Sequence, residues 1–347
     1  MNNNNKEEYF MNKLTKIGAS ALCGSLAAMS AANAGDLGVT GGVDMSWTSL
    51  SKENNGNPIG IGSNLTFSGS GELDNGWTVA LSTAYSNKAV YSNTNVTVTV
   101  PGLGGFRISQ GVSGSGIDRM DDMTPTVWEE AYGAGLGSGI DTVSGVSAGS
   151  NIEWTPDMLP SGMTARVSWS PDAGGSAAAD KGTAESSGSA KGSGYDITVV
   201  ADGDATPDGL TLYGGLSHVD VYQNDSAYND DVSEMTAGVK YAVGSFTLGY
   251  QWSREENGRA STKTEYNNDG YGVTFSINDD LSIGYNNYKS EQTSTTNIEV
   301  EASTVQIAYS VGGLSVRLAD QTVDNAKYTT ATTAQRDATT LSVALAF

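Results

Sequence analysis

The chain has 347 residues, a formal net charge of −21, an apolar content of 38% and 44 glycines. This acidic excess argues against nucleic-acid binding, because phosphate contacts require clustered lysine and arginine. The apolar content is low for a chain of this length with an ordinary globular core, whereas a polypeptide that encloses water needs no such core.

The N-terminal segment has the order of parts found in a secretory signal peptide. These parts are a polar extension (1–10), a basic stretch (11–16), an apolar run of small residues (17–29) and an Ala-x-Ala cleavage site (32–34). We therefore predict a signal peptide over residues 1–34, with residues 1–10 an upstream extension and Met11 the true start, followed by one domain over 35–347. The single cysteine, Cys23, lies inside the signal peptide, so no thiol chemistry is expected in the mature chain.

From residue 35 onward the chain repeats a segment of about ten residues that alternates apolar with small or polar side chains, and each segment ends in a turn. Period-two alternation is typical of a strand with one face in an apolar medium and the other in water. Repetition without helical segments predicts a sheet that closes on itself, with lipid as the apolar medium. The predicted strands are 38–48, 60–71, 76–86, 94–101, 104–110, 148–156, 162–170, 194–202, 209–218, 234–243, 245–254, 269–277, 280–289, 301–310, 313–321 and 338–347.

The connections between these strands alternate in length. Every second connection is a tight turn rich in Gly, Pro, Asn and Asp, and the others are long and polar, including the Gly/Ser/Ala-rich segment 171–193. Tight turns on one side and long loops on the other are typical of outer-membrane barrels. The predicted fold class is thus all-β, a 16-stranded antiparallel transmembrane barrel.

Side-chain parity predicts which face of each strand meets lipid. In the last strand Leu341, Val343 and Leu345 point one way, while Ser342 and Ala344 point the other. The first face is aliphatic with aromatic residues near its ends, as expected of a lipid-facing surface with interfacial girdles. The second face is small and polar, as expected of a wet lumen.

The longest connection, residues 111–147, holds six acidic residues against one base, Arg119. A loop of this length inside a compact protein tends to be functional. A barrel of about sixteen strands encloses an aqueous channel, so this third long loop can fold inward and narrow it. The alternative is that its carboxylates form a solvated surface.

Four features together resemble the general bacterial porins of Gram-negative species, in particular the alphaproteobacterial Rhodobacter type. They are the signal peptide, the sixteen strands, the stretch D-D-x-T-P-T-x-x-E-E at 121–130 and the terminal Phe347. The resemblance implies a homotrimer in the outer membrane, in contact with lipid and lipopolysaccharide, whose third loop sets acidic residues against basic residues on the barrel wall. Carried over to this chain, the acidic side consists of Asp118, Asp121, Asp122, Glu129 and Glu130.

For the basic side, strand parity directs four cations toward the lumen: Arg107, Arg166, Lys240 and Arg317. A lipid-facing arginine would cost about 2–4 kcal/mol at the membrane midplane, which favours this assignment. Residues 35–106 hold only Lys52 and Lys88, both in predicted loops, so the cationic wall is thin and a mild cation preference is expected.

The loop aspartates Asp118, Asp121 and Asp122 offer a candidate Ca²⁺ site, because Ca²⁺ favours several oxygen ligands and some relatives bind calcium. The sequence has no regular D-x-D-x-D-G loop to support it. No other cofactor is expected.

The function predicted from the sequence is passive diffusion of small hydrophilic solutes and ions, filtered by size and charge, with no enzymatic activity. One alternative is a substrate-specific channel, for which Tyr213 and Tyr288 are the candidate lining aromatics. A second is a secreted β-rich adhesin or surface protein. A third alternative is a barrel enzyme, which would need a nucleophile with a general base beside it. His218 is the only histidine and is expected at the surface, so the sequence offers little support for such a base.

Overall fold

The computed structural model describes residues 37–50, 57–87, 90–111, 114–133, 135–147, 149–174, 191–221, 228–260, 265–293 and 297–347. The predicted signal peptide 1–34, Lys52, Lys88 and most of the segment 171–193 lie outside the described residues. Within the described part no helix has the length and hydropathy needed to cross a membrane.

The described residues form sixteen antiparallel strands in one closed barrel, which confirms the predicted fold class. The strands are β1 Gly38–Leu50, β2 Ile59–Glu72, β3 Thr78–Ser86, β4 Val90–Val100, β5 Gly104–Gly111, β6 Asn151–Thr155, β7 Met163–Ser170, β8 Lys191–Ala201, β9 Leu210–Val221, β10 Val232–Val243, β11 Phe246–Glu256, β12 Glu265–Ser276, β13 Leu281–Thr293, β14 Ile298–Val311, β15 Leu314–Asp324 and β16 Arg336–Ala346. The described parts of the connections contain four short 3-10 helices: η1 Gly116–Met120, η2 Gly203–Ala205, η3 Ala326–Tyr328 and η4 Thr332–Ala334.

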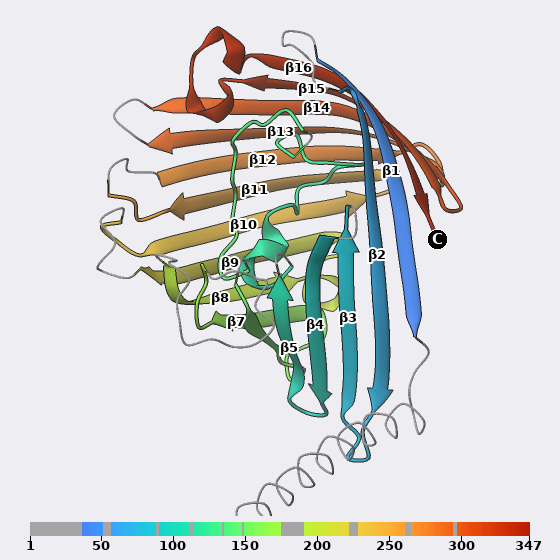
Figure 1. The fold of residues 1–347 in the computed structure, drawn as a ribbon, viewed down its shortest axis with the longest axis vertical. Coiled ribbons are helices and arrows are strands. Elements are labelled where there is room, and N and C mark those ends of the chain that lie inside the picture. Colours follow the sequence, from blue (N-terminus) through green and yellow to red (C-terminus); the bar gives the residue numbers. More distant parts are fainter. Residues whose placement is uncertain are drawn as a thin grey trace, which may run out of the picture.

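The first and last strands close the barrel. Each strand pairs with its neighbours in the chain, and β1 pairs with β16 from Gly42 opposite Ala346 to Leu50 opposite Ala338. Beyond this ladder, Gly41 and Phe347 exchange both backbone hydrogen bonds at 3.0 Å. In Figure 1 the strands β1–β5 cross the direction of β9–β14 steeply in projection, as expected of tilted strands on opposite walls of a barrel.

On the side of the barrel with the longer connections, some strands extend further than the sequence predicted. β12 begins at Glu265 rather than at 269, and β13 ends at Thr293 rather than at 289. These extensions are polar, so they lack the apolar alternation that marks the lipid-facing part, but the hydrogen-bond ladder between the strands continues. Two connections predicted to be long are therefore short, at 87–89 and 294–297, and the predicted alternation of connection lengths is wrong at these two places.

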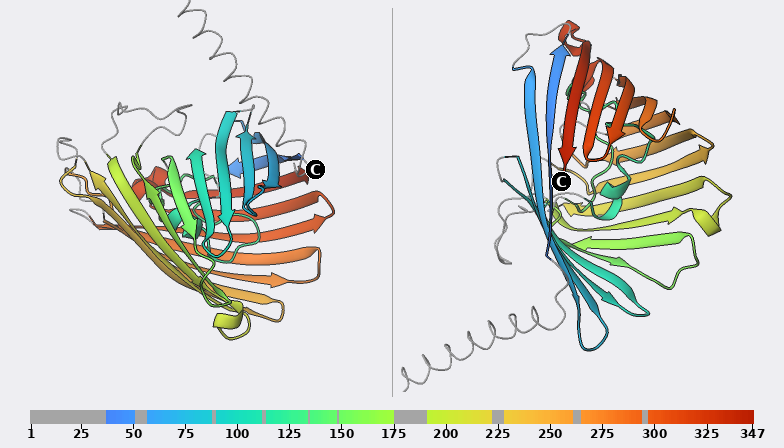
Figure 2. Two further views of the ribbon diagram at one scale, coloured as in Figure 1. Left: turned by 90° about the horizontal axis from the view of Figure 1, so that it is seen from below. Right: turned by 90° about the vertical axis from the view of Figure 1, so that its right-hand side faces the viewer.

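One face of the barrel wall is exposed and apolar. Exposed side chains include Leu248 and Leu341, together with aromatic residues near the strand ends. The rings of Phe246 and Phe275 lie 4.6 Å apart, and those of Phe106 and Trp154 stack at 6.2 Å. Figure 2 shows the wall from two further sides. Exposed apolar residues over so many strands match the surface predicted to meet lipid.

The opposite face of the same strands, called here the polar face, is largely buried and hydrophilic. Its buried side chains include Ser168, Asp196, Thr236, Gln251 and Asn268. Because successive strand residues point to opposite sides, each of these residues lies between exposed or partly exposed neighbours on its strand. Parity in the sequence is therefore sufficient to separate the two faces.

Candidate functional site

The connection between β5 and β6, residues 112–150 and here called the long loop, lies against the polar face of nine strands. In Figure 1 its green trace runs from the end of β5 past β9 toward β13. Arg107 of β5 and Arg336 of β16 donate to its carbonyl groups. Polar side chains of β6, β8 and β10–β14 also hydrogen-bond to it. They are Glu153, Asp196, Glu234, Gln251, Asn268, Asn286, Tyr288 and Gln306. These contacts hold the loop against the wall, while a solvated surface formed by its carboxylates stays an alternative, because Asp122 and Glu129 are exposed.

Two buried carboxylates hold both limbs of the long loop by its backbone. Asp196 Oδ2 accepts hydrogen bonds from the N–H groups of Ile117 (3.0 Å) and Val146 (3.2 Å). Glu234 Oε2 accepts from the N–H groups of Ser144 (2.7 Å) and Gly145 (2.8 Å). Burying a carboxylate is costly unless donors surround it, and these N–H groups supply that compensation.

Two glycines of the long loop allow this close approach. Gly116 and Gly145 have φ of +59° and +55°, a region that other residues rarely adopt. A Cβ at Gly116 would lie 1.9 Å from Asp196 Oδ2, and one at Gly145 would lie 2.4 Å from the same atom. Both positions therefore require glycine for conformation and for space.

A third carboxylate, Glu153, binds the only base of the long loop. Arg119 donates from Nη2 to Glu153 Oε1 (2.6 Å) and from Nε to Oε2 (3.2 Å), and Gly116 N–H adds a bond of 2.8 Å. The charges of Arg107 and Arg166 interact with both partners of this ion pair. Arg119 thus joins two wall arginines, and we call these three residues the arginine group.

The Thr-Pro-Thr segment of the long loop packs against a row of glycines on β11 and β12. A Cβ at Gly249 would lie 2.3 Å from Pro125 Cδ, and one at Gly272 would lie 2.2 Å from Pro125 O. Gly249 and Gly272 are cross-strand neighbours without side chains, so together they form a depression in the wall that accommodates Pro125. Beside it, the Tyr288 hydroxyl donates to Thr124 Oγ1 at 2.5 Å.

Two side-chain amides on β13 and β14 bind the next part of the long loop. Gln306 Oε1 accepts from Trp128 N–H (3.0 Å), and Gln306 Nε2 donates to Glu129 O (2.5 Å). Asn286 Oδ1 accepts from Ala131 N–H (2.9 Å). An amide both donates and accepts, so it can satisfy backbone groups of either kind without introducing charge.

The end of the acidic stretch leads into an apolar cluster. Ala131, Leu136 and Ile140 pack there with buried residues of β13–β16, and the rings of Tyr132 and Tyr288 meet edge to face at 4.7 Å and 77°. The long loop is therefore fixed by packing in its middle and by carboxylates on its two limbs.

The five predicted acidic residues form one electrostatically coupled group, called here the acidic group. Burial, with the nearby charges of Asp122 and Asp118, raises the pKa of Asp121 to about 8. Burial, with the charges of Asp122 and Glu129, raises the pKa of Glu130 to about 7. The pKa values of Asp118 and Glu129 are raised as well, mainly by burial.

The four predicted wall cations do not form a single cluster. Arg107 and Arg166 belong to the arginine group, and Arg107 also donates to Gly114 O in the long loop. Arg317 lies elsewhere: Nη1 bonds to Asp44 Oδ2 at 3.1 Å, and its Cζ is 5.8 Å from the centre of the Trp128 ring. Lys240 lies on β10 with Thr211 and Gly249 as its cross-strand neighbours.

Sequence reasoning missed the carboxylates that hold the site together: Glu153, Asp196, Glu234 and Asp44. The available signal was strand parity. Glu153 stands between Ile152 and Trp154, and Asp196 between Tyr195 and Ile197, so their apolar neighbours point to the lipid and the acids do not. The same rule that placed the arginines would have placed these acids.

A cavity of about 520 Å³ lies over the polar face of β1, β2, β15 and β16. Asp44 and Arg317 line it together with small residues such as Gly62, Ser315 and Ala344. The long loop reaches β16 through Arg336, at the opposite end of that strand from Ala344 of the cavity, so this part of the wall lies beside the loop.

The predicted calcium site remains a prediction. Among the described residues, one group of three His, Cys, Asp or Glu residues has ligand atoms that all lie within 4.8 Å of one another. It consists of His218, Asp220 and Asp231 and does not include the loop aspartates.

A closed barrel with a buried polar face and an exposed apolar one is common to several families of membrane proteins, so the fold alone does not decide the family. A model of the Gram-negative porins matches residues 18–347. The chain belongs to the Gram-negative porin family. This match confirms the resemblance at the level of the family, and the porin is an outer-membrane diffusion channel. Membership of the Rhodobacter-type subgroup stays a prediction.

Solved structures with the same fold are distant in sequence from the porin. OmpF of Salmonella typhi, in complex with daunomycin, is 11% identical, with a TM-score of 0.69 over 90% of this chain and 97% of that one. The anion-selective porin from Comamonas acidovorans is 15% identical, with a TM-score of 0.66 over 90% and 99%. A mutant of the Rh. blastica porin is 14% identical, with a TM-score of 0.58 over 90% and 100%. A search of curated proteins gave no match.

Proposed function

We propose that this porin is a general diffusion pore whose long loop folds inward and filters small hydrophilic solutes by size and charge. The observation that carries this proposal is the set of hydrogen bonds from the long loop to polar-face side chains on nine strands. A closed barrel has two surfaces, and the exposed apolar one faces lipid. A loop bound to the other surface is inside the lumen and takes up part of its cross-section.

The open passage then runs beside the long loop, along β1, β2, β15 and β16. The cavity of about 520 Å³ lies there, lined by Asp44, Arg317 and small side chains. Small lining residues leave room for hydrated solutes, and the barrel is wide enough to remain open beside a loop. Size selection follows from the width that the loop leaves.

The passage carries charge of both signs, with acid in excess. The arginine group shares Glu153, and Arg317 is paired with Asp44, so part of the positive charge is neutralised. Among the described residues the acidic group is less well compensated: Arg119 and Arg317 lower the pKa values of Asp118 and Glu129 only against a larger effect of burial. We therefore propose a mild cation preference, opposite to that of the Comamonas acidovorans porin, which is described as anion-selective.

A substrate-specific channel with an aromatic track is less well supported. Tyr213 and Tyr288, the candidate lining residues, are only 5% and 1% exposed. Their hydroxyl groups bond to Gln251 and to Thr124 of the long loop. Both rings therefore lie under the loop rather than along a passage, and we propose no enzymatic activity either.

We also propose that the porin assembles as a homotrimer in contact with lipid and lipopolysaccharide. A structure of OmpT from Vibrio cholerae, 11% identical to this chain, was determined in a trimer form. The extensive exposed apolar surface of the barrel supports the lipid contact.

The test is planar-bilayer conductance of the purified porin with a salt gradient across the membrane. The reversal potential should favour cations, and neutralising Asp122 and Glu129 together should reduce that preference. Asp320→Asn removes a carboxylate of similar exposure on the apolar face and should leave selectivity unchanged. An anion-selective wild type, or equal effects of the loop and control variants, would contradict the proposal.

A further inference from the structure

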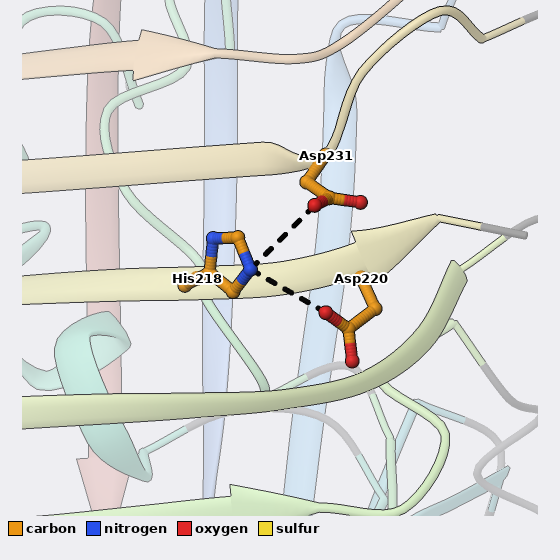
Figure 3. A group of neighbouring side chains, drawn as sticks. All are labelled: His218, Asp220 and Asp231. Carbon is orange, nitrogen blue, oxygen red and sulfur yellow. Dashed lines mark ion pairs between the residues drawn. The ribbon is translucent and has the colours of Figure 1, made fainter.

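The only histidine of the chain lies in a cluster outside the pore. His218 and Asp220 are two residues apart on β9, so both side chains point to the same face, and Asp231 directly precedes β10 (Figure 3). That face is the apolar one, because exposed Leu212 and Leu216 share its parity. The cluster lies at the C-terminal end of β9, and the centres of the His218 and Tyr195 rings are 5.7 Å apart.

The three side chains present one nitrogen and two oxygens to a common point. His218 Nε2 lies 3.4 Å from Asp220 Oδ1 and 3.7 Å from Asp231 Oδ2. Figure 3 shows both carboxylates turned toward the same edge of the imidazole ring. The ligand atoms of all three residues lie within 4.8 Å of one another.

Neighbouring groups outside the cluster orient both carboxylates. Ser193 Oγ on β8 donates to Asp220 Oδ2 at 2.6 Å, and Val221 N–H donates to Asp231 Oδ1 at 2.9 Å. In each aspartate one oxygen is thus held by β8 or β9, and the other is left to face Nε2. Hydrogen bonds of this kind, which fix the orientation of ligands, are typical of metal sites.

The spacing fits a small tetrahedral cation. Zinc lies about 2.0–2.1 Å from histidine nitrogen and carboxylate oxygen, so the edges of its coordination tetrahedron are about 3.3–3.4 Å long. The separations of 3.4 and 3.7 Å from Nε2 are close to that value. One imidazole with two carboxylates suits zinc and its neighbours in the first transition series, whereas Ca²⁺ and Mg²⁺ prefer oxygen ligands alone.

We propose that His218, Asp220 and Asp231 form a site for a divalent transition metal such as Zn²⁺ on the outer rim of the barrel. The side chains are 37%, 58% and 43% exposed, so the metal can enter from solvent and a water molecule can complete the coordination. The site ties β9 to β10 next to the lipid-facing surface. It lies outside the lumen, so the metal does not block the pore.

The test uses the full porin, folded and without a histidine tag. Zn²⁺ binding is measured by calorimetry in excess Mg²⁺, which occupies sites made of carboxylates alone. Cu²⁺ then serves as a spectroscopic probe: because the chain has one histidine, splitting of its electron paramagnetic resonance signal by one imidazole nitrogen reports on this site alone. We expect one Zn²⁺ per chain and a Cu²⁺ signal with that splitting.

Variants separate a metal site from a simple ion pair of protonated histidine. His218→Ala and Asp220→Asn should each weaken Zn²⁺ binding by about tenfold or more, since even outer-shell changes cost about 10–100-fold. Asp269→Asn, an exposed aspartate on the apolar face of β12, is the matched control and should bind as the wild type does. Unaltered unit conductance shows that each variant is folded. Equal affinity in His218→Ala, or a Cu²⁺ signal without nitrogen splitting, would overturn the proposal.

Discussion

Replacing Asp196 with alanine should loosen the long loop without opening the barrel wall. One oxygen of this buried side chain holds the N–H groups of Ile117 and Val146, which lie on the two limbs of the loop. A hydrogen bond to a charged group is worth about 1.5–3 kcal/mol, so the two bonds amount to about 3–6 kcal/mol. Lumen water entering the space recovers part of this, and we expect the free energy of local opening to fall by about 2 kcal/mol.

Hydrogen exchange followed by mass spectrometry measures this effect where it occurs. A loss of about 2 kcal/mol corresponds to a roughly thirtyfold faster exchange of the amides of Ile117 and Val146. Peptides from β11–β14 should keep their protection. In planar bilayers the same variant should show a noisier open-channel current, because the loosened start of the loop moves in and out of the passage.

A second variant tests the same anchor from the loop side. Gly145→Ala keeps the carboxylate but places a methyl group 2.4 Å from Asp196 Oδ2 at a φ of +55°, so it should also speed exchange at Val146. Asp320→Asn on the apolar face should change neither measurement. Unchanged exchange in both anchor variants would refute the view that Asp196 holds the loop in place.

Three further changes should follow from the described contacts. Cation preference should rise between pH 6 and pH 9, because carboxyl groups are neutral below their pKa, and the pKa values of Asp121 and Glu130 are about 8 and about 7. Reversal potentials that show a falling or constant cation preference over this range would contradict this prediction. Arg317→Gln should increase cation preference, because it leaves the carboxylate of Asp44 without its counter-ion. A shift of the reversal potential toward anion selectivity would show that the ion pair does not line the passage. Deleting Phe347 should lower the yield of folded barrel, because it removes the pair of backbone hydrogen bonds with Gly41. Phe347→Leu keeps these bonds and should fold better than the deletion. Equal yields of the deletion and of Phe347→Leu would assign the effect to the ring alone.

The sequence was most informative where lipid and water impose opposite demands on successive residues. Sixteen strands could be placed because each contains such an alternating segment, and their ends were wrong by several residues where both faces meet water, as at β12 and β13. The stretch 121–130 identified the long loop as the candidate site. Its contacts could not be predicted, because Gln251 and Gln306 are unremarkable as single residues and acquire a role only from what lies opposite them.

Composition and period-two patterning were thus sufficient to predict a closed, lipid-facing sheet and the side of each strand that is polar, because these depend on local residue order and on the solvent. Only the tertiary structure decided which carboxylates hold the long loop, that Arg119 joins the wall arginines, and that His218 meets two aspartates on the outer rim. These arrangements join residues far apart in the chain, and their energies depend on burial and on distances that closure of the barrel sets.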